Sequence, residues 1–370
     1  MKVLMMARNL VTDLSGPRYA TEIARELIDS HNDVFIPTSN IKVELKNANI
    51  LKLPSFFGKK PQSTLLYTLY GAAVRSKYNI QIVHGNGYTL NDDVTTVHFM
   101  SEAFDRQTKR FGMLKSSPKS YRSFVEKFIL NSSKHLIAVS SLVKRDLIRL
   151  YNVPSERITT IHNGVTLNEF SVPTDQNKTI ETQSVLREYG FDLNKKLLLF
   201  VGGGAYERKG FRFLVNALKY ISDDVAVVAI CRNLDVESQR LLTKLDIDKK
   251  VRIVNYVKDI SRLYRAADIY ILPTIYDPFP LAVLEAMACG LPVIVSSCTG
   301  ITDIIDNGRN GIVVNDPSDS EELSNAINSL AQSYDQRKVM GLDARSTVEE
   351  LSWKNVTRKV LDLYEQLSEK

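Results

Sequence analysis

The chain has 370 residues, of which 44% are hydrophobic and 24% are charged, and its formal net charge is +6. This balance excludes an intrinsically disordered chain, and the length favours two domains. Three cysteines without a Cys-x-x-Cys pair exclude a disulfide framework and fit buried thiols of a reducing compartment. No apolar run approaches the roughly 18 residues of a transmembrane helix, so we expect a cytoplasmic protein that does not span the membrane.

The positive charge is concentrated in the first half of the sequence. Residues 1–170 carry a net charge of +9, whereas residues 171–370 carry −3. Within residues 101–134, eight basic side chains outnumber three acidic ones. This excess favours an acidic partner, which is a membrane surface, a nucleic acid or an anionic substrate, although a merely soluble basic face is an equal alternative. No recognition motif supports nucleic acid, so we expect none as a partner.

The first half of the chain predicts alternating strands and helices, because short apolar runs alternate with apolar residues at helical spacing. The predicted strands are Lys2–Ala7, Val34–Ile36, Ile80–Val83, Thr95–Phe99 and Leu136–Val139, and the predicted helices are Tyr19–Ser30 and Leu142–Tyr151. One face of a further helix is formed by Tyr121, Phe124, Val125, Phe128 and Ile129. We expect this face to pack in the core, with insertion into a membrane as the alternative.

A polar, poorly patterned stretch over residues 171–185 predicts a linker, after which the alternation restarts. The predicted strands are Lys196–Val201, Val225–Ile230, Val251–Val254, Ile269–Leu272 and Pro292–Val295, and the predicted helices are Phe211–Tyr220, one ending at Leu245, Ile260–Ala266, Leu281–Cys289 and an amphipathic Trp353–Leu367. Both halves are therefore expected to be doubly wound α/β domains. Because such sheets bind ligands at the carboxyl ends of their strands, we expect a ligand between the two halves.

The segment from Ala267 to Gly300 contains the most informative polar residues. A loop presents Asp277, and a helix begins nearby, with Pro280 at its first position. The N–H groups of Leu281 and Ala282 lack partners within the helix, and together with the helix dipole they form a site suited to phosphate. Glu285, about one turn further, can accept two hydrogen bonds from a ribose diol. Because this helix is otherwise apolar, a buried Glu285 needs a partner.

A second motif, GGGAYERKG, follows the strand that starts at Lys196. Its glycines allow a ligand to approach the backbone closely, and Arg208 and Lys209 follow them. The dinucleotide fingerprint fails because Glu207 occupies the position of its third glycine. Two adjacent cations beside a glycine turn are better suited to a diphosphate than to NAD.

The first half offers weaker candidates. Gly16 closes the loop before the first helix, and His84 and His98 end two strands, where a structural and a functional role are about equally expected. The Asp-x-Asp sequence at Asp246 and Asp248 is interpreted as a solvated turn. We find no His, Cys and carboxylate cluster with the spacing of metal ligands, so no metal or cofactor is expected.

Together these residues resemble glycosyltransferase family 4, the retaining, two-domain GT-B enzymes. The resemblance covers nearly the whole chain and is strongest over residues 138–170, at GGGAYERKG, over residues 267–311 and in the closing helix. It implies an N-terminal acceptor-binding domain, residues 1–170 with the returning helix 353–370, and a nucleotide-sugar-binding domain, residues 171–352. The ERKG form and the basic region after His98 are similar to the lipopolysaccharide core glucosyltransferases.

The resemblance also implies roles for individual residues. Arg208 and Lys209 match the basic pair that neutralises the donor diphosphate. Asp277 and Glu285 match the two acids of the Glu-x7-Glu motif, which contact the donor sugar and the ribose. The remaining matches to the donor-binding segments are Gly16, His98, Tyr256, Val257, Phe279, Leu281 and Ala282. The sequence departs from the family pattern where Asp277 replaces Glu and where Pro280 replaces Gly, which affects the expected choice of donor sugar.

The sequence therefore predicts a metal-independent, retaining transfer of a hexose from a nucleoside diphosphate sugar, a UDP-sugar in preference to a GDP-sugar. The expected acceptor is a hydroxyl of a glycan or lipid-linked glycan, as in polysaccharide biosynthesis. Residues 101–134 would place the enzyme on the cytoplasmic face of an anionic membrane. The alternatives are a GT-B epimerase or phosphorylase, and a nucleotide-sugar-binding partner subunit with weakened catalysis.

Overall fold

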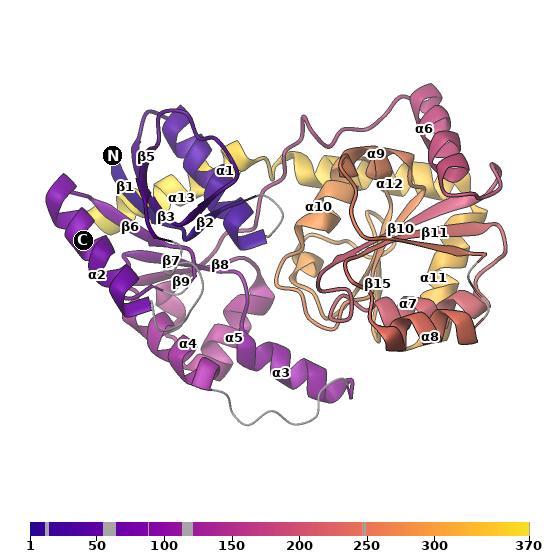
Figure 1. Cartoon of the computed structure of the whole chain (residues 1–370), viewed down its shortest axis with the longest axis horizontal. Coiled ribbons are helices and arrows are strands. Elements are labelled where there is room, and N and C mark those ends of the chain that lie inside the picture. Colours follow the sequence, from indigo (N-terminus) through magenta and orange to yellow (C-terminus); the bar gives the residue numbers. More distant parts are fainter. Residues whose placement is uncertain are drawn as a thin grey trace. The chain divides into compact units, whose positions relative to one another are not determined.

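The computed structural model describes residues 1–11, 15–54, 64–87, 89–112, 121–245, 247 and 249–369. The chain divides into two compact units (Figure 1). The first unit comprises Met1–Lys109, Leu114–Gly164 and Trp353–Lys370, and the second comprises Arg110–Met113 and Val165–Ser352. Each unit is built on a parallel sheet, so the predicted α/β class is confirmed. Among the described residues, no helix combines the length and apolar character needed to cross a membrane.

The first unit contains a seven-stranded parallel sheet in the order β5-β3-β1-β6-β7-β8-β9. Its central strands are buried on both faces, which explains why they read as continuous apolar runs. The strands are β1 (Lys2–Met6), β3 (Asp33–Thr38), β5 (Asn49–Lys52), β6 (Ile82–Gly85), β7 (Val94–Val97), β8 (His135–Ala138) and β9 (Ile158–Thr160), with a small separate pair, β2 (Asn9–Leu10) and β4 (Asn40–Ile41). The helices are α1 (Ser15–Asp29), α2 (Thr64–Tyr78), α3 (Ser101–Arg110), α4 (Tyr121–Ser132) and α5 (Ser141–Tyr151), followed by the 3-10 turn η3 (Ser155–Arg157).

The last helix, α13 (Trp353–Ser368), packs against α1 and so completes the first unit, as predicted (Figure 1). Its buried face includes Val356, Val360 and Tyr364. The hydroxyl of Tyr364 also forms a short hydrogen bond with Nδ1 of His84, at the end of β6. The helix therefore joins the core of this unit through both apolar packing and a buried polar contact.

The second unit contains a six-stranded parallel sheet in the order β12-β11-β10-β13-β14-β15. The strands are β10 (Lys196–Gly203), β11 (Val225–Cys231), β12 (Val251–Val254), β13 (Ile269–Leu272), β14 (Val293–Ser296) and β15 (Ile312–Val314). The helices are α6 (Asp175–Glu188), α7 (Phe211–Ala217), α8 (Val236–Lys244), α9 (Ile260–Ala266), α10 (Leu281–Ala288), α11 (Ser320–Gln332) and α12 (Tyr334–Glu349), with 3-10 turns η4 (Leu218–Tyr220) and η5 (Gly300–Asp303).

Both sheets reverse their strand order at one point, between β1 and β6 in the first unit and between β10 and β13 in the second. On either side of such a switch point the connecting segments leave the sheet in opposite directions, which opens a crevice beyond the carboxyl ends of the two strands. The residues that follow β1, β6, β10 and β13 are therefore the candidates for contact with a ligand.

The linker predicted over residues 171–185 is wrong, because α6 occupies most of it. Thr174 caps this helix by accepting a hydrogen bond from the N–H of Asn177. The helix attaches to α9 largely through polar contacts: the Thr182 hydroxyl donates to the carbonyl of Ala266 over 2.7 Å, and Arg265 pairs with Glu181 at 3.0 Å. These contacts leave no apolar periodicity, so the helical pattern was not visible in the sequence.

The face of α4 that was predicted to pack in the core is only partly buried in the structure. Ile129 is buried, whereas the side chains of Phe124 and Phe128 are 72% and 62% exposed. The buried side of α4 instead includes Glu126, which accepts hydrogen bonds from the N–H of Ser101 and from the hydroxyl of Tyr151. Core packing is therefore wrong for the two phenylalanines, because the helix turns a hydrogen-bonded carboxylate inward.

Candidate functional site

An ion pair joins the two loops at the switch point of the second unit. Arg208 follows β10, and Asp277 follows β13, so the fold itself brings these two residues together. Nη1 of Arg208 lies 3.1 Å from Oδ2 of Asp277 and also donates to the carbonyl of Tyr276 over 2.5 Å. Both side chains are largely shielded from solvent, which strengthens their attraction.

The backbone of these loops is equally constrained. The carbonyl of Arg208 accepts hydrogen bonds from the N–H of Ile275 and from the hydroxyl of Thr274, at 3.0 and 2.9 Å. Gly210 has a φ of +86°, and a Cβ built there would lie 1.8 Å from the carbonyl oxygen of Pro273. Only glycine fits this position, so the ERKG turn is held rigidly against the end of β13.

The side chain of Lys209 is directed toward β10, the strand that precedes it, where Nζ donates a hydrogen bond to the carbonyl of Val201 over 3.2 Å. Burial lowers the pKa of this ammonium group, and the carboxylate of Asp277 opposes that effect, as does that of Glu285. The predicted cations and carboxylates are therefore close enough to act on one another electrostatically. Arg208 and Lys209 are cations that can each form charge-assisted hydrogen bonds with an anion.

The helix that follows Asp277 begins at Leu281, as its predicted range gives, but Pro280 does not take the first helical position that was expected for it. Pro280 is the cap of α10, with φ −71° and ψ 118°, so Leu281 is the first helical residue. No side chain caps the helix, which leaves the first N–H groups, including those of Leu281 and Ala282, as donors for a ligand. Phe279, 2% exposed, anchors the preceding loop in the core.

Glu285 lies one turn into α10 and is only 7% exposed. The partner that such a carboxylate requires is Tyr264 of α9, whose hydroxyl donates to Oε2 of Glu285 over 2.9 Å. Burial raises the pKa of Tyr264 well above its usual value, and the neighbouring carboxylate adds to this effect. The sequence does not identify Tyr264 as this partner, because Tyr264 lies 21 residues before Glu285 and belongs to the apolar pattern of another helix.

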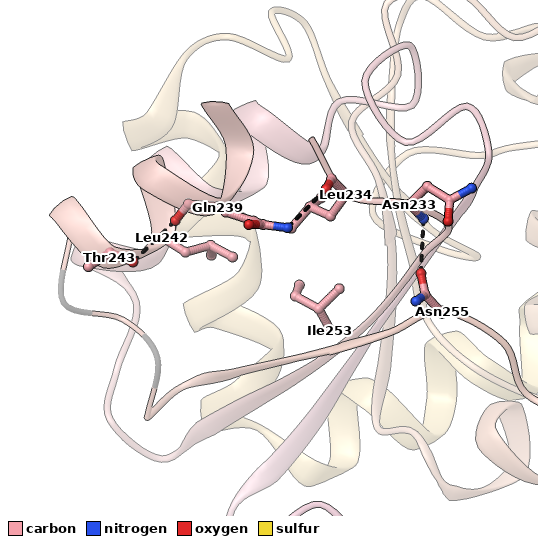
Figure 2. Close-up of a pocket in the computed structure, with 7 residues that line it drawn as sticks. All are labelled: Asn233, Leu234, Gln239, Leu242, Thr243, Ile253 and Asn255. Carbon is pink, nitrogen blue, oxygen red and sulfur yellow. Dashed lines mark hydrogen bonds between the residues drawn. The ribbon is translucent and has the colours of Figure 1, made fainter. Parts of the chain in front are cut away.

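Tyr256 and Val257 follow β12, at the opposite side of β11 from the ion pair. The ring of Tyr256 is 70% exposed. Beside it, Oδ1 of Asn255 accepts a 2.9 Å hydrogen bond from the N–H of Asn233, which joins the loops after β11 and β12 (Figure 2). A pocket of about 400 Å³ opens there, between these loops and α8 (Figure 2).

In the first unit, the structure brings together Gly16 and His98, two of the predicted site residues. A third residue, Asn86, which the sequence did not indicate, connects them. The ring of His98 lies beside Gly16, and Asn86 bonds to both. The signal available in the sequence was one asparagine directly after β6. Nothing in the pattern distinguishes such a residue from an ordinary turn asparagine.

His84 is a core residue. It is fully buried, and its Nε2 lies 2.7 Å from the hydroxyl of Thr96 while its Nδ1 meets Tyr364. With both ring nitrogens occupied inside the protein, His84 has a structural role.

Asp246 and Asp248 lie outside the described residues. Elsewhere in the described part of the chain, no group of three or more His, Cys, Asp or Glu side chains is placed to hold a metal ion.

Comparisons with known proteins agree with this architecture. The family model "Glycosyltransferase Family 4" matches residues 16–169, and "Glycosyl transferases group 1" matches residues 195–333. An uncharacterized glycosyltransferase of Methanocaldococcus jannaschii is 29% identical over 63% of this chain and 60% of its own length. The O-antigen chain mannosyltransferase B of Escherichia coli is 26% identical over 99% of this chain and all of its own. The chain thus spans about 60% of the archaeal relative.

Two solved structures have the same fold. WaaG, a glycosyltransferase involved in lipopolysaccharide biosynthesis, superposes with a TM-score of 0.80 at 18% identity, over 98% of this chain and 99% of that one. HepE of Anabaena, solved in complex with UDP and glucose, gives a TM-score of 0.76 at 17% identity, over 99% of both chains. The predicted GT-B fold is therefore confirmed.

Proposed function

The chain belongs to glycosyltransferase family 4, and we propose that it transfers a hexose, with retention of anomeric configuration, from a nucleoside diphosphate sugar to a hydroxyl of a glycan or lipid-linked glycan. One observation carries this proposal: the Arg208–Asp277 pair spans the switch point of the second unit, beside the uncapped start of α10. This arrangement offers cations and backbone donors to a diphosphate at the place where the fold opens a crevice.

The proposed chemistry requires departure of the nucleoside diphosphate. The bond between the anomeric carbon and the diphosphate oxygen breaks, and a bond from the acceptor oxygen forms on the same face of the sugar. The leaving phosphate oxygen takes the acceptor proton. Arg208, Lys209 and the N–H groups at the start of α10 stabilise the negative charge that develops on the diphosphate, which is a large contribution in such reactions. No metal ion is needed for this step.

Donor binding follows from the same residues. Glu285 accepts hydrogen bonds from the ribose hydroxyls, and the backbone of Tyr256 and Val257 contacts the base. We favour UDP over GDP, and the likeness to HepE, solved with UDP, supports this choice. Asp277 contacts the donor sugar once a ligand takes over part of its pairing with Arg208.

The test of donor binding is thermal stabilisation by UDP, GDP and ADP, each with and without magnesium. We expect UDP to raise the midpoint most, without magnesium, and Glu285→Gln to remove most of the shift. Lack of stabilisation by any nucleotide would overturn the assignment of the site and favour a non-catalytic partner subunit. With a UDP-sugar and a glycan acceptor, release of UDP without a glycan product would instead indicate an epimerase, and dependence on phosphate a phosphorylase.

We also propose that the first unit docks on an anionic membrane through the basic residues of the stretch 101–134 and through α2. Within that stretch, Arg110–Met113 belong to the second unit, and residues 113–120 lie outside the described part of the chain. Phe124 and Phe128 project from α4, and α2 exposes Leu65, Leu66 and Leu69, each more than half exposed. Helices α2 and α4 bond to neighbouring residues of one loop. The hydroxyl of Thr68 in α2 accepts a hydrogen bond from the N–H of Leu90, and the hydroxyl of Ser132 in α4 accepts one from the N–H of Asn91. Exposed apolar side chains beside a basic segment suit a surface of anionic lipid.

Vesicle sedimentation tests this docking. We expect binding to vesicles containing phosphatidylglycerol, weaker binding to phosphatidylcholine alone, and loss of binding as salt is raised, because each basic residue near the surface contributes about 1 kcal/mol. The double variant Phe124→Ser/Phe128→Ser should bind at least tenfold more weakly. Tyr220→Ser, which removes an exposed aromatic ring from the second unit, should leave binding unchanged. Equal binding by all three proteins would contradict the assigned surface.

A further inference from the structure

Three segments of the first unit converge on one imidazole ring. Gly16 lies in the first turn of α1, Asn86 directly follows β6, and His98 follows β7. Nδ2 of Asn86 donates to the carbonyl oxygen of Gly16 over 2.9 Å, and Oδ1 of Asn86 lies 2.9 Å from Nε2 of His98. A Cβ built on Gly16 would lie 3.5 Å from the ring of His98, so the backbone and the ring are in close proximity.

These contacts determine which way the Asn86 amide faces. A carbonyl oxygen only accepts hydrogen bonds, so the group that meets Gly16 must be the NH2 end of the amide. The other end, Oδ1, therefore faces His98. Because Oδ1 also only accepts, Nε2 of His98 must carry the proton. The chain of contacts from Gly16 to His98 thus selects one tautomer of the imidazole.

The selected tautomer leaves Nδ1 of His98 as an acceptor. This atom is shielded from solvent and has no hydrogen-bond partner among the described residues. Leaving a shielded acceptor without a donor is unfavourable, and a donor from a ligand would remove this cost. The ring of Tyr19 lies edge-on to that of His98, with the two centroids 4.7 Å apart, and His84 is close enough to interact with His98 electrostatically. Burial lowers the pKa of His98 to about 3, so the ring is neutral near pH 7.

We propose that Asn86 is a positioning residue, which holds His98 in the Nε2–H tautomer and so presents Nδ1 as an acceptor for a hydroxyl of the donor sugar. The identity of the ligand rests on the proposed function, whereas the tautomer does not. Asn86 would act through His98 and need not touch the sugar itself. Asn86 directly follows β6, at the switch point of the first unit between β1 and β6. From there it contacts both the first turn of α1 and the segment that follows β7.

The tautomer can be measured directly in the full-length protein. The chain has only five histidines, so 15N-labelled histidine gives a simple NMR spectrum, in which His98→Gln identifies the signals of His98. At pH 8 we expect Nε2 of His98 to show the shift of a protonated ring nitrogen and Nδ1 that of an unprotonated one. The reverse pattern in the wild-type protein would overturn the proposal without any variant of Asn86.

Two variants separate the functions of the amide. Asn86→Leu removes both hydrogen bonds and should yield a mixture of tautomers, whereas Asn86→Asp keeps an acceptor for Nε2–H and should retain the tautomer. Asn32→Leu is the matched control, since Asn32 also bonds to a backbone carbonyl of this unit, that of Leu27. It should leave the His98 signals unchanged. If Asn86→Leu retains a single Nε2–H tautomer, Asn86 is not the residue that positions the ring.

A kinetic measurement tests the link to the sugar. Asn86→Leu should lower kcat for the UDP-sugar at least tenfold while the affinity for UDP, which lacks the sugar, stays within twofold of wild type. An unchanged kcat would overturn the role of Asn86 in the reaction. If wild-type protein turns over no nucleotide sugar, the proposed function fails, but the NMR measurement still decides whether Asn86 fixes the tautomer.

Discussion

In the first unit, the neutral amide of Asn86 joins the first turn of α1 to the loop after β6. In the second unit, the Arg208–Asp277 ion pair joins the loop after β10 to the loop after β13. The topological position is the same, but the chemistry differs. A neutral amide and imidazole suit hydroxyl groups, whereas paired charges beside a helix start suit a diphosphate. Under the proposed function, each switch point therefore offers partners to a different class of chemical group.

The largest expected effect comes from removing the cation of the second switch point. Arg208→Ala should lower kcat by about 10²–10³-fold, because a donor to the developing charge on the leaving group is lost. The variant also leaves Asp277 without this partner, so the double variant Arg208→Ala/Asp277→Asn should recover stability but not turnover. Arg212→Ala, in the following helix, is the control. UDP release kinetics measure all four proteins, and full turnover by Arg208→Ala would refute the charged site.

Substitution by alanine should cost more stability at Gly210, in the second unit, than at Gly16, in the first. Gly210→Ala forces a Cβ into the carbonyl of Pro273 at a positive φ, and we expect it to lower the free energy of unfolding by at least about 2 kcal/mol. Gly16→Ala meets only ordinary contact with His98 and should cost less than about 1 kcal/mol. Urea denaturation compares the two. Similar losses would mean that both turns are equally constrained.

Lowering the pH should lower the stability of the first unit through the buried His84. Burial lowers the pKa of His84 to about 3, whereas an unfolded histidine has a pKa near 6.5. Between these values the unfolded chain binds the extra proton, so the stability contribution of His84 falls by about 2 kcal/mol from pH 7 to pH 5. His84→Gln should have a shallower pH dependence of the urea midpoint over that range. Parallel profiles for the two proteins would contradict the neutral, buried His84.

The smallest effect is expected at the ribose site. Tyr264→Phe removes the hydroxyl that donates to Glu285 and should cost about 1 kcal/mol of stability. Calorimetric titration should show a two- to fivefold loss of UDP affinity, because the carboxylate loses its orientation. Glu285→Gln should lose more affinity than Tyr264→Phe. The reverse order would indicate that Tyr264, and not Glu285, contacts the nucleotide.

Much of the fold could be predicted because buried parallel strands are continuous apolar runs. The strand Val251–Val254 and the helix Ile260–Ala266 were predicted to the residue. Helix α6 was missed because its contacts are polar, and the exposure of Phe124 was missed because periodicity does not say which face turns inward. Arg208 and Asp277 belong to recognisable motifs. Asn86 and Tyr264 gain their significance only from contacts between distant loops, which no local pattern records.

The division of the chain has a consequence for its synthesis. The second unit is nearly contiguous, Val165–Ser352, whereas the first requires α13, whose Tyr364 meets His84 across 280 residues. On the ribosome, the second unit can therefore complete its sheet while the first still lacks a helix of its core. Domains that emerge first usually fold first. Here the first unit must wait, with part of its apolar surface uncovered, until α13 has been translated.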